Sequence, residues 1–362
     1  MQVYGCKISY YTGKLEAYLR FRGIRYQSLS SIGNEKKLLA GAGVVQMPVV
    51  QLDDGRWMTD TTPMLNWLES EQKAPTIFPI NPVLKFVARL IEDYADEWLW
   101  RAAMHYRWSY RSDGCYAAEA IYTDGIEGNR PVPRFIALPL IKRRQLGSFV
   151  RGDGVTSDTT EHVERGYLTA LDRLQAIFER RPFVLGDTPT IADFGLMGPM
   201  LRHFGQDPTP AEIMRTRAPA VYEWVARMWN TRAEASGSYL IHEVDDVLTD
   251  LLLEVCQTHL AQLRQNAQAY SNNLTRFNQN IQDCHYDQVP TSRYRVWCLE
   301  ELRRAWTALD DSAKEILRAH LISPEAAVLW DEVVFSPSDY DSERQAPFNR
   351  GINVYATGIP LR

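Results

Sequence analysis

The residues that could take part in chemistry lie mostly in the first 110 positions of this chain. A run of hydroxyl side chains, Ser9 to Thr12, separates a segment that alternates like a strand from a segment with helical periodicity. Hydroxyl groups near a helix N-terminus can stabilise a negative charge. Asp60 and Thr61 precede a second helix with an apolar face, and either side chain can cap it. Both positions therefore combine a hydroxyl group with the start of a helix.

The cysteines give no sign of a metal or disulfide site. Their number is odd, they form no Cys-x-x-Cys pair, and no Cys/His spacing suits zinc. The five positions are Cys6, Cys115, Cys256, Cys284 and Cys298. We expect no metal, and free thiols in a reducing cytoplasm, with Cys6 packed in the interior. The hydroxyl-rich loop contains no cysteine, which disfavours a mechanism that passes through a mixed disulfide.

Composition excludes several classes of protein. The net charge is −5 and the pI is about 5.9, whereas nucleic-acid binding needs a concentrated basic surface. No apolar run approaches the roughly 18 residues that a membrane span needs, and the N-terminus lacks the order of a signal peptide. We therefore expect neither a nucleic-acid partner nor a membrane partner, and a length of 362 residues predicts two or three domains.

The pattern of the first 110 residues begins with a strand, a loop, a helix and a strand. Residues 2–8 alternate as a strand, 14–23 have the period of a helix, and 24–28 form a second strand. The strand-like segment 44–52 is broken by Pro48, and a helix follows Asp60. The proline-rich stretch 73–82 indicates a linker, and a long helix follows from residue 83.

The remainder predicts further helices and one irregular segment. Residues 112–158 contain many glycines and prolines, which indicates a long insertion with one helix near 136–149. Thr190 and Asp193 form the pattern of an N-capping box. Helices are expected at 160–180, 220–229, 241–270 and 293–320, and the last thirty residues should be an irregular tail. The expected domains are 1–76, 83–235 with the insertion at about 112–158, and a mostly helical extension at 236–362.

Four motifs in order resemble the glutathione S-transferase superfamily. They are the strand-loop-helix start, Gln-Met-Pro-Val-Val at 46–50, Asp-Gly-x-x-x-x-Asp-Thr-x-x-Met-Leu at 54–65, and Phe-Val-Leu-Gly-Asp-x-Pro-Thr-Ile-Ala-Asp-Phe at 183–194. Further stretches resemble a bacterial branch with long C-terminal extensions and features of metaxin and failed-axon-connections proteins. The resemblance covers about residues 1–235. It implies a thioredoxin-like α/β domain followed by an all-α domain, with the extension added.

The resemblance also implies a glutathione site. Pro48 matches a cis-proline, Met47 matches the residue whose backbone pairs with the cysteinyl part of glutathione, and Gln46 matches a position near the glycyl end. Asp60 and Thr61 replace the usual Glu-Ser pair that receives the γ-glutamyl carboxylate at a helix N-terminus. The local pattern also permits a simpler interpretation, in which these two residues only cap the helix.

Thiol activation is the least determined part of the expected site. In serine- and cysteine-type transferases the activating residue lies five positions before a basic residue of the first helix, and counting back from Lys14 gives Ser9. Tyr10 and Tyr11 are alternatives, as is the absence of any catalytic donor. For the electrophile we expect a cleft between the domains, formed by Tyr10 or Tyr11 and by residues of the long helix. The helix residues are Trp98, His105 and Trp108, although an aromatic stripe of this kind also suits a core.

Three functions are compatible with this interpretation. The first is a cytoplasmic glutathione transferase, expected as a homodimer through its first domain and long helix, that acts on a small electrophile. The second is a non-catalytic binding or scaffold protein, because the Glu-Ser pair is altered and the chain carries an insertion and an extension. The third is a dedicated glutathione-dependent isomerase or lyase, which the fold cannot distinguish from the first.

Overall fold

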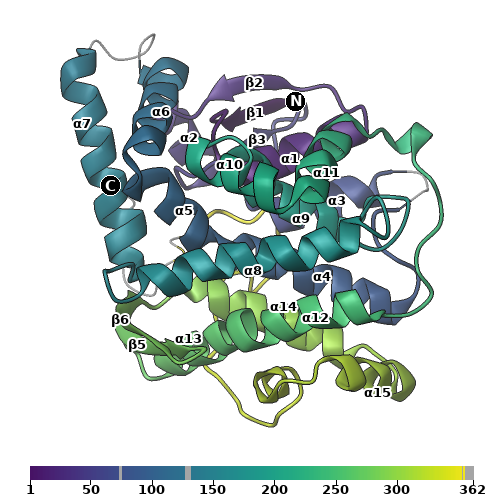
Figure 1. Ribbon diagram of the computed structural model, residues 1–362. Helices are drawn as coiled ribbons and strands as arrows, with labels where there is room; N and C mark the ends of the chain where they lie inside the picture. The colour runs from purple at the N-terminus through teal and green to yellow at the C-terminus, as the bar shows by residue number, and fades with distance from the viewer. Residues whose placement is uncertain (73–75, 127–131, 353, 355–362) are drawn as a thin grey trace.

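The first domain is a four-stranded sheet with helices packed against it. The computed structural model describes residues 1–72, 76–126, 132–352 and 354 (Figure 1). Strands lie in the order β2-β1-β3-β4, with β1 parallel to β2 and antiparallel to β3. The elements are β1 (Gln2–Gly5), α1 (Tyr10–Phe21), β2 (Gln27–Ser30), α2 (Glu35–Ala42), β3 (Val49–Gln51), β4 (Trp57–Met58) and α3 (Thr61–Ser70). The predicted α/β domain is therefore present.

Helix α1 begins earlier than the sequence pattern indicated. The expected start was residue 14, but the helix begins at Tyr10 and Ser9 is its N-cap. Tyr10, Tyr11 and Thr12 therefore belong to the first helical turn and not to a loop. The reason is that β-branched and aromatic residues are only weakly unfavourable in a helix, so the cap and the tertiary packing decide the boundary.

A helical domain follows. It contains α4 (Pro82–Glu97), α5 (Leu99–Ser109), α6 (Arg111–Ile121), α7 (Arg134–Gln145), α8 (Thr160–Phe178), α9 (Ile191–Pro199), α10 (Pro208–Arg217) and α11 (Pro219–Asn230). The long helix expected from residue 83 is thus divided at Trp98 into α4 and α5. The predicted all-α second domain is confirmed.

The segment 112–158 is more regular than its composition indicated. Helices α6 and α7 fill most of its described part, and α7 continues into a π-helical turn at Leu146–Val150. Gly114 lies within α6 and Pro139 within α7. Packing of α6 against α5 and of α7 against α6 stabilises both helices despite these residues, so composition alone underestimated the helix content.

Helix α9 fixes the first domain against the second. Thr190 and Asp193 form the predicted capping box, with the Thr190 N–H donating to Asp193 at 2.9 Å. Gly195 and Gly198 allow close contact: an added Cβ would lie 2.7 Å from Glu92 Cα on α4 and 2.9 Å from the Tyr10 ring on α1. The small residues therefore set the spacing of α1 and α4, which flank the candidate site.

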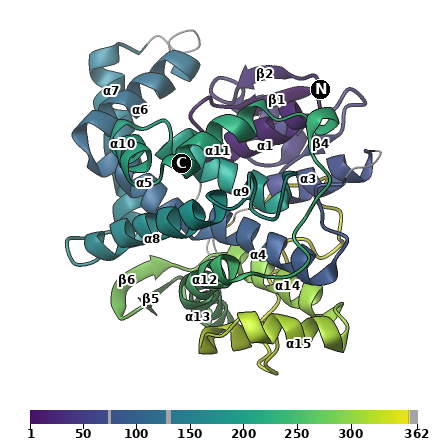
Figure 2. The same ribbon diagram turned by 45° about the vertical axis from the view of Figure 1, so that its right-hand side comes forward.

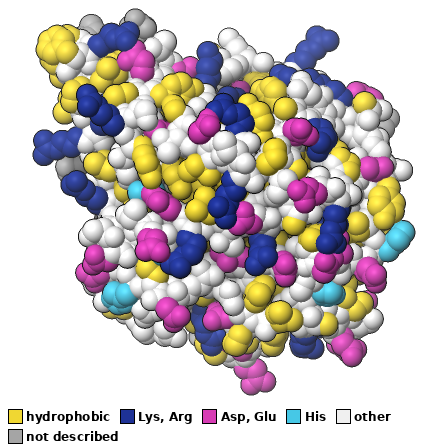
Figure 3. Space-filling model, viewed as in Figure 1, with side chains coloured by type: hydrophobic (Ala, Val, Ile, Leu, Met, Phe, Trp, Pro, Cys, Tyr) yellow, Lys and Arg dark blue, Asp and Glu magenta, His cyan; other side chains and the backbone are white. Residues whose placement is uncertain are grey.

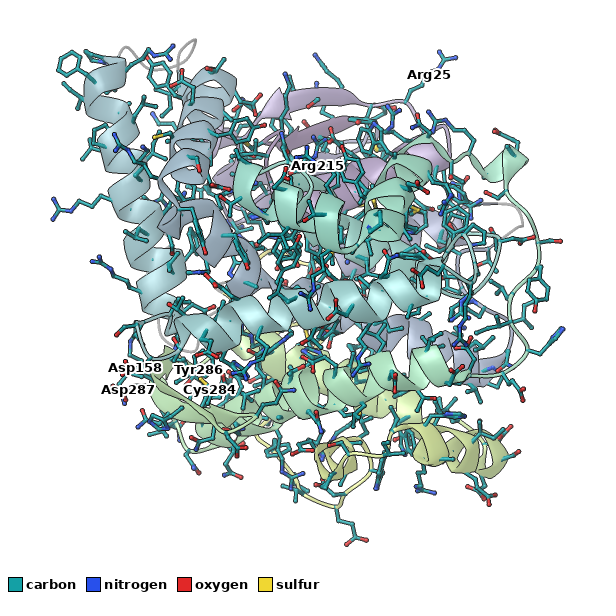
Figure 4. The ribbon with its side chains drawn as sticks, in the orientation of Figure 1. Arg25, Asp158, Arg215, Cys284, Tyr286 and Asp287 are labelled. Carbon is teal, nitrogen blue, oxygen red and sulfur yellow. The ribbon has the colours of Figure 1, made fainter. Side chains whose placement is uncertain are left out.

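Besides a π-helical turn at Cys256–Leu260 and a short 3-10 helix at Pro324–Leu329, the described part of the C-terminal extension contains four α-helices and a hairpin. They are α12 (Asp246–Val255), α13 (Ala261–Ser271), β5 (Arg276–Ile281), β6 (Cys284–Pro290), α14 (Arg293–Thr307) and α15 (Asp311–His320). The expected helix at 293–320 is two helices, because Asp310 caps a new one. The hairpin was not predicted. Figure 4 labels Cys284, Tyr286 and Asp287 on β6, and the Tyr286 hydroxyl contacts His162 Nδ1 of α8 at 2.6 Å.

The extension also covers the first two domains. Figure 2 shows α12, α14 and α15 beneath α4, and the Trp306 ring of α14 lies 5.6 Å from that of Phe86. The described part of the tail, from Trp330 to Ile352, contains neither helix nor strand, as predicted, but it is anchored. The Thr59 N–H donates to the Pro347 carbonyl at 3.0 Å, and the Phe348 ring packs on Trp67 of α3. The extension therefore packs on parts of α3 and α4, and both the first domain and the long helix were expected to take part in a dimer.

Some large apolar side chains of the described residues are exposed on helix α7. Hydrophobic and basic groups gather at the upper left of Figure 3, where Figure 1 places α6 and α7. Phe135 and Leu140 of α7 are 77% and 57% exposed. Among the helices of the described ranges, none is both long and apolar enough to cross a membrane.

Candidate functional site

A cavity of about 780 Å³ lies where the first domain, the helical domain and the extension meet. Its first-domain wall contains Ser9, Tyr10, Tyr11, Gln46, Met47, Pro48, Asp60 and Thr61. Its helical wall contains Trp100, Met104, Arg107, Trp108, Ile121, Arg144, Gln145, Ser148 and Phe149. Its extension wall contains Pro290, Ser292, Tyr294, Arg295, Tyr340 and Val354. Segments distant in sequence thus enclose one space of the size that small ligands occupy.

Ser9 stands at the positive end of α1 and faces this cavity. Its backbone is extended, and its Oγ accepts a hydrogen bond from the Thr12 N–H at 3.4 Å. Because this bond is long and uses only one lone pair, the hydroxyl hydrogen remains able to donate to a ligand. The helix dipole at this end favours an anionic acceptor.

Tyr10 and Tyr11 line the same wall, but their hydroxyl groups point away from it. The Tyr10 hydroxyl donates to the Ala95 carbonyl, and the Tyr11 hydroxyl donates to the Asp96 carbonyl at 3.0 Å. Burial raises the pKa of both phenols well above the ordinary value. Tyr11 instead presents its ring, which stacks on Trp100 with 5.7 Å between centroids. Its geometry suits contact with an apolar ligand better than proton transfer.

Gln46, Met47 and Pro48 form the part of the wall that precedes β3. The Met47–Pro48 peptide bond is cis. Pairing between β1 and β3 begins at Val49, opposite Tyr4, so Met47 lies beyond the paired part of the sheet. All three residues line the cavity. The backbone of Met47 is consequently positioned beside the ligand space rather than inside the sheet.

Asp60 and Thr61 lie at the start of α3 and line the cavity. Asp60 is the N-cap, with a left-handed φ of 69°, and its Oδ1 accepts from the Thr62 N–H at 3.3 Å. Oδ1 also accepts from the Tyr294 hydroxyl at 3.0 Å, and Oδ2 accepts from the Tyr340 hydroxyl at 3.4 Å. Burial raises the pKa of Asp60 to about 7. Asp60 therefore caps the helix and faces the cavity at once.

Lys14 has a structural place close to the site. Its ammonium group is buried and contacts the carboxylates of Glu92 and Asp96 on α4, and it donates to the Thr62 hydroxyl at 3.0 Å. Burial alone would lower its pKa, but the two carboxylates outweigh that effect and raise it. Lys14 thus ties α1, α3 and α4 together and fixes the position of Ser9.

The structure brings only part of the expected aromatic wall to the cavity. Trp108 lines the cavity, but Trp98 and His105 do not. Trp98 packs edge to face on His162, and His105 Nε2 lies 2.9 Å from Glu164 of α8. Trp98 and His105 are seven residues apart and share one helix face, which turns toward α8. The face with Trp100, Met104 and Trp108 turns toward the cavity instead.

Several cavity residues were not predicted. Trp100 lies eight residues before Trp108, so both share one helix face, and the helical period could have predicted that Trp100 lines the cavity. Tyr294, Arg295 and Tyr340 gave no such signal, because only the path of the extension brings them to the first domain.

Cysteine and metal chemistry have little support in the cavity. Cys6 lines it, but burial raises the pKa of this thiol to about 12, so the reactive thiolate is scarce at neutral pH. All five cysteines are free thiols. Among the residues that the structure describes, no three or more His, Cys, Asp or Glu are arranged to hold a metal ion.

Comparison with protein families identifies both domains. Residues 8–71 match the model of the glutathione S-transferase N-terminal domain, and residues 157–227 match that of the glutathione S-transferase C-terminal domain. No curated protein sequence matches the chain.

Solved structures of similar fold include three bacterial proteins. A glutathione S-transferase from Rhodospirillum rubrum F11 is 18% identical, with 63% of this chain and 87% of that chain covered and a TM-score of 0.42. The β-etherase LigF from Sphingobium sp. strain SYK-6 is 15% identical, with 63% of this chain and 93% of that chain covered and a TM-score of 0.45. A GST-like protein from Pseudomonas syringae is 19% identical, with 68% of this chain and 78% of that chain covered and a TM-score of 0.44. The assignment of the domains comes from the family models.

Proposed function

We propose that this chain, which belongs to the glutathione S-transferase superfamily through its two matched domains, binds glutathione and activates its thiol for attack on a small electrophile. The observation that carries the proposal is the convergence of Ser9, Met47–Pro48 and Asp60–Thr61 on one cavity. These three segments are the ones whose residue types suit the sulfur, the peptide backbone and the γ-glutamyl end of the tripeptide.

Ser9 would perform the chemical step. A free thiol has a pKa of about 8.5, so most of it is protonated at neutral pH and unreactive. A hydroxyl donor at the N-terminus of α1 stabilises the thiolate more than the thiol, which lowers this pKa. The thiolate then attacks the electrophile and forms the new carbon–sulfur bond while the leaving group departs.

The electrophile would bind beside the aromatic side chains of the helical wall. Tyr11, Trp100, Trp108 and Phe149 surround this part of the cavity, and the Trp100 and Phe149 rings are 5.8 Å apart and perpendicular. Such walls favour flat apolar molecules, because stacking and burial both contribute to their binding.

The test compares Ser9→Ala with Ser28→Ala, an exposed serine on β2 that serves as the matched control. Ser9→Ala should abolish the ultraviolet absorbance of the bound thiolate and lower kcat/KM by about 100-fold or more, with glutathione affinity changed by less than about tenfold. Ser28→Ala should behave like the wild type. If the thiolate signal survives Ser9→Ala but is lost in Tyr11→Phe, the role belongs to Tyr11.

A second candidate function is glutathione-independent binding by a non-catalytic protein. The observation that favours it is the occupation of Asp60 by two phenols of the extension, which fills part of the space around this carboxylate. Retention on immobilised glutathione and a rise in Tm with glutathione support the transferase. If neither occurs, the non-catalytic function is the better explanation. A dedicated isomerase or lyase would need a screen of substrates.

The proposal includes a cytoplasmic homodimer. Because the extension packs on α4 and α3, the interface would have to use other surfaces of the first domain and of α5. Light scattering after size exclusion measures the mass directly, and a mass of about 42 kDa, that of one chain of 41.6 kDa, would contradict the dimer.

A further inference from the structure

We propose that the C-terminal extension completes the ligand site: Tyr294 and Tyr340, held against Asp60, form with it a subsite for a primary ammonium group of the ligand. The inference rests on the proposed function, since glutathione carries such a group at its γ-glutamyl end. It assigns a role in binding to the extension, which lies outside both matched domains.

The three residues come from three separate parts of the chain. Asp60 caps α3, Tyr294 lies in the first turn of α14, and Tyr340 belongs to the irregular tail. The two phenol rings are nearly perpendicular with centroids 5.1 Å apart, and Trp297 packs behind both at 5.2–5.3 Å. All three residues of the proposed subsite line the same cavity.

The hydrogen bonds leave acceptors for a ligand. Oδ1 of Asp60 accepts from Thr62 and from Tyr294, whereas Oδ2 accepts only the longer bond from Tyr340 among the described contacts. Each carboxylate oxygen has two lone pairs, and a phenol that donates its hydrogen still has acceptor capacity on its oxygen. Oδ2 and the two phenol oxygens can therefore receive the three N–H groups of one ammonium ion. The adjacent aromatic faces also attract a cation.

The surrounding charges leave this region short of positive charge. The ionisable groups that act on Asp60 and its tyrosines come from α1, α4, α14 and the tail; they are Lys14, Glu92, Glu97, Cys298 and Asp341. Lys14 is engaged by Glu92 and Asp96, and Arg295 pairs with Glu97 at 3.0 Å. The five carboxyl groups Asp60, Glu92, Asp96, Glu97 and Asp341 thus outnumber the two cations Lys14 and Arg295, so a bound ammonium would add positive charge where acidic groups predominate.

The tail holds Tyr340 firmly on both sides. Before it, Ser338 donates from its N–H and its hydroxyl to Glu300 of α14, at 2.7 and 2.6 Å. After it, the Pro347 carbonyl accepts from the Thr59 N–H, next to Asp60. The tyrosine is thus prepositioned, which reduces the entropy that ordering it would cost on binding.

The subsite makes binding depend on pH. An ammonium ion is attracted by an ionised Asp60, and burial raises the pKa of this carboxyl to about 7. Below that pH the carboxyl holds a proton and the attraction weakens. The hydrogen bond from Tyr294 opposes the effect of burial, so its removal should raise the pKa further.

The experiment measures, by calorimetry, the affinity of the full chain for glutathione and for its analogue in which a glutaryl group replaces γ-glutamyl and so lacks the ammonium. At pH 8 the wild type should prefer glutathione by tenfold or more, and the preference should fall to below threefold at pH 6. Tyr294→Phe combined with Tyr340→Phe should reduce the preference at pH 8 to below threefold. Tyr286→Phe is the matched control, a buried tyrosine of the extension that bonds His162 outside the cavity, and it should keep the full preference.

The outcomes separate the two proposals. If the wild type binds neither compound, both the proposed function and the subsite are wrong. If it binds both equally at pH 8, or if the double variant keeps the tenfold preference, glutathione binding stands and the subsite is wrong. If the double variant does not fold, the wild-type pH dependence decides: a preference unchanged between pH 6 and 8 overturns the subsite, and its loss at pH 6 supports it.

Discussion

Two buried acidic clusters contact the start of α3, and they differ in what compensates their charge. In the first, the Lys14 ammonium contacts Glu92 and Asp96, so cation and anions come from the chain itself. In the second, Asp60 accepts hydrogen bonds from the neutral phenols of Tyr294 and Tyr340. The first cluster joins α1 to α4, and the second joins α3 to the extension.

This difference in compensating groups indicates which cluster stabilises the fold and which is available to bind a ligand. A buried ion pair that is complete has no need of an external group, and breaking it leaves an uncompensated charge. Asp60 receives its hydrogen bonds from neutral donors, and burial raises its pKa to about 7 although the charge of Lys14 opposes the shift, so this carboxyl can gain from a cationic ligand. The first cluster should therefore dominate stability, and the second should dominate the response to pH and ligand.

The largest expected effect is that of Lys14→Met. It removes the cation between two buried carboxylates, so the free energy of unfolding should fall by about 3–5 kcal/mol. Chemical denaturation measures this change. Lys36→Met, at an exposed position of α2, is the matched control and should change stability by less than about 0.5 kcal/mol. A loss below about 1 kcal/mol for Lys14→Met would show that the first cluster is not structural.

The next effect concerns Asp60→Asn and has a definite sign. The pKa of Asp60 is raised in the folded chain to about 7 from 3.8, so its contribution to stability is present at low pH and is lost as the pH rises through 7. Between pH 4 and pH 8, the wild type should lose about 4 kcal/mol relative to Asp60→Asn. Unfolding curves of both proteins across this range measure the difference. A constant difference would mean that Asp60 titrates normally.

The smallest effect is expected for single phenol removals in the absence of ligand. Tyr294→Phe breaks a bond of 3.0 Å and should cost about 1 kcal/mol of stability, whereas Tyr340→Phe breaks one of 3.4 Å and should cost less. Thermal melts of the two variants, measured at pH 8, give the order. Equal losses, or a larger loss for Tyr340→Phe, would contradict the ranking of the two contacts.

The sequence predicted more of the first-domain wall than of the other walls. Ser9, Met47, Pro48, Asp60 and Thr61 were identified through the resemblance of short motifs to those of glutathione S-transferases, and all line the cavity. Such motifs are visible because a helix cap or a strand break constrains a few adjacent residues. Of the three residues expected in the helical wall, Trp108 lines the cavity, whereas Trp98 and His105 lie on the helix face toward α8. Helical periodicity shows which residues share a face, but it does not show which element that face contacts.

By itself, then, the sequence determined the strand-loop-helix start of the first domain, the helical character of the second domain outside 112–158 and the capping box at Thr190 and Asp193, and the resemblance gave the candidate residues of the first domain. Each depends on interactions between residues close together in the chain. Only the tertiary structure decided that the helices of 112–158 line the cavity, that the tyrosine hydroxyls at 10 and 11 are engaged by carbonyls of α4, and that Tyr294 and Tyr340 reach Asp60. These depend on contacts between residues 85 to 280 positions apart, whose geometry is set by packing and leaves no local pattern.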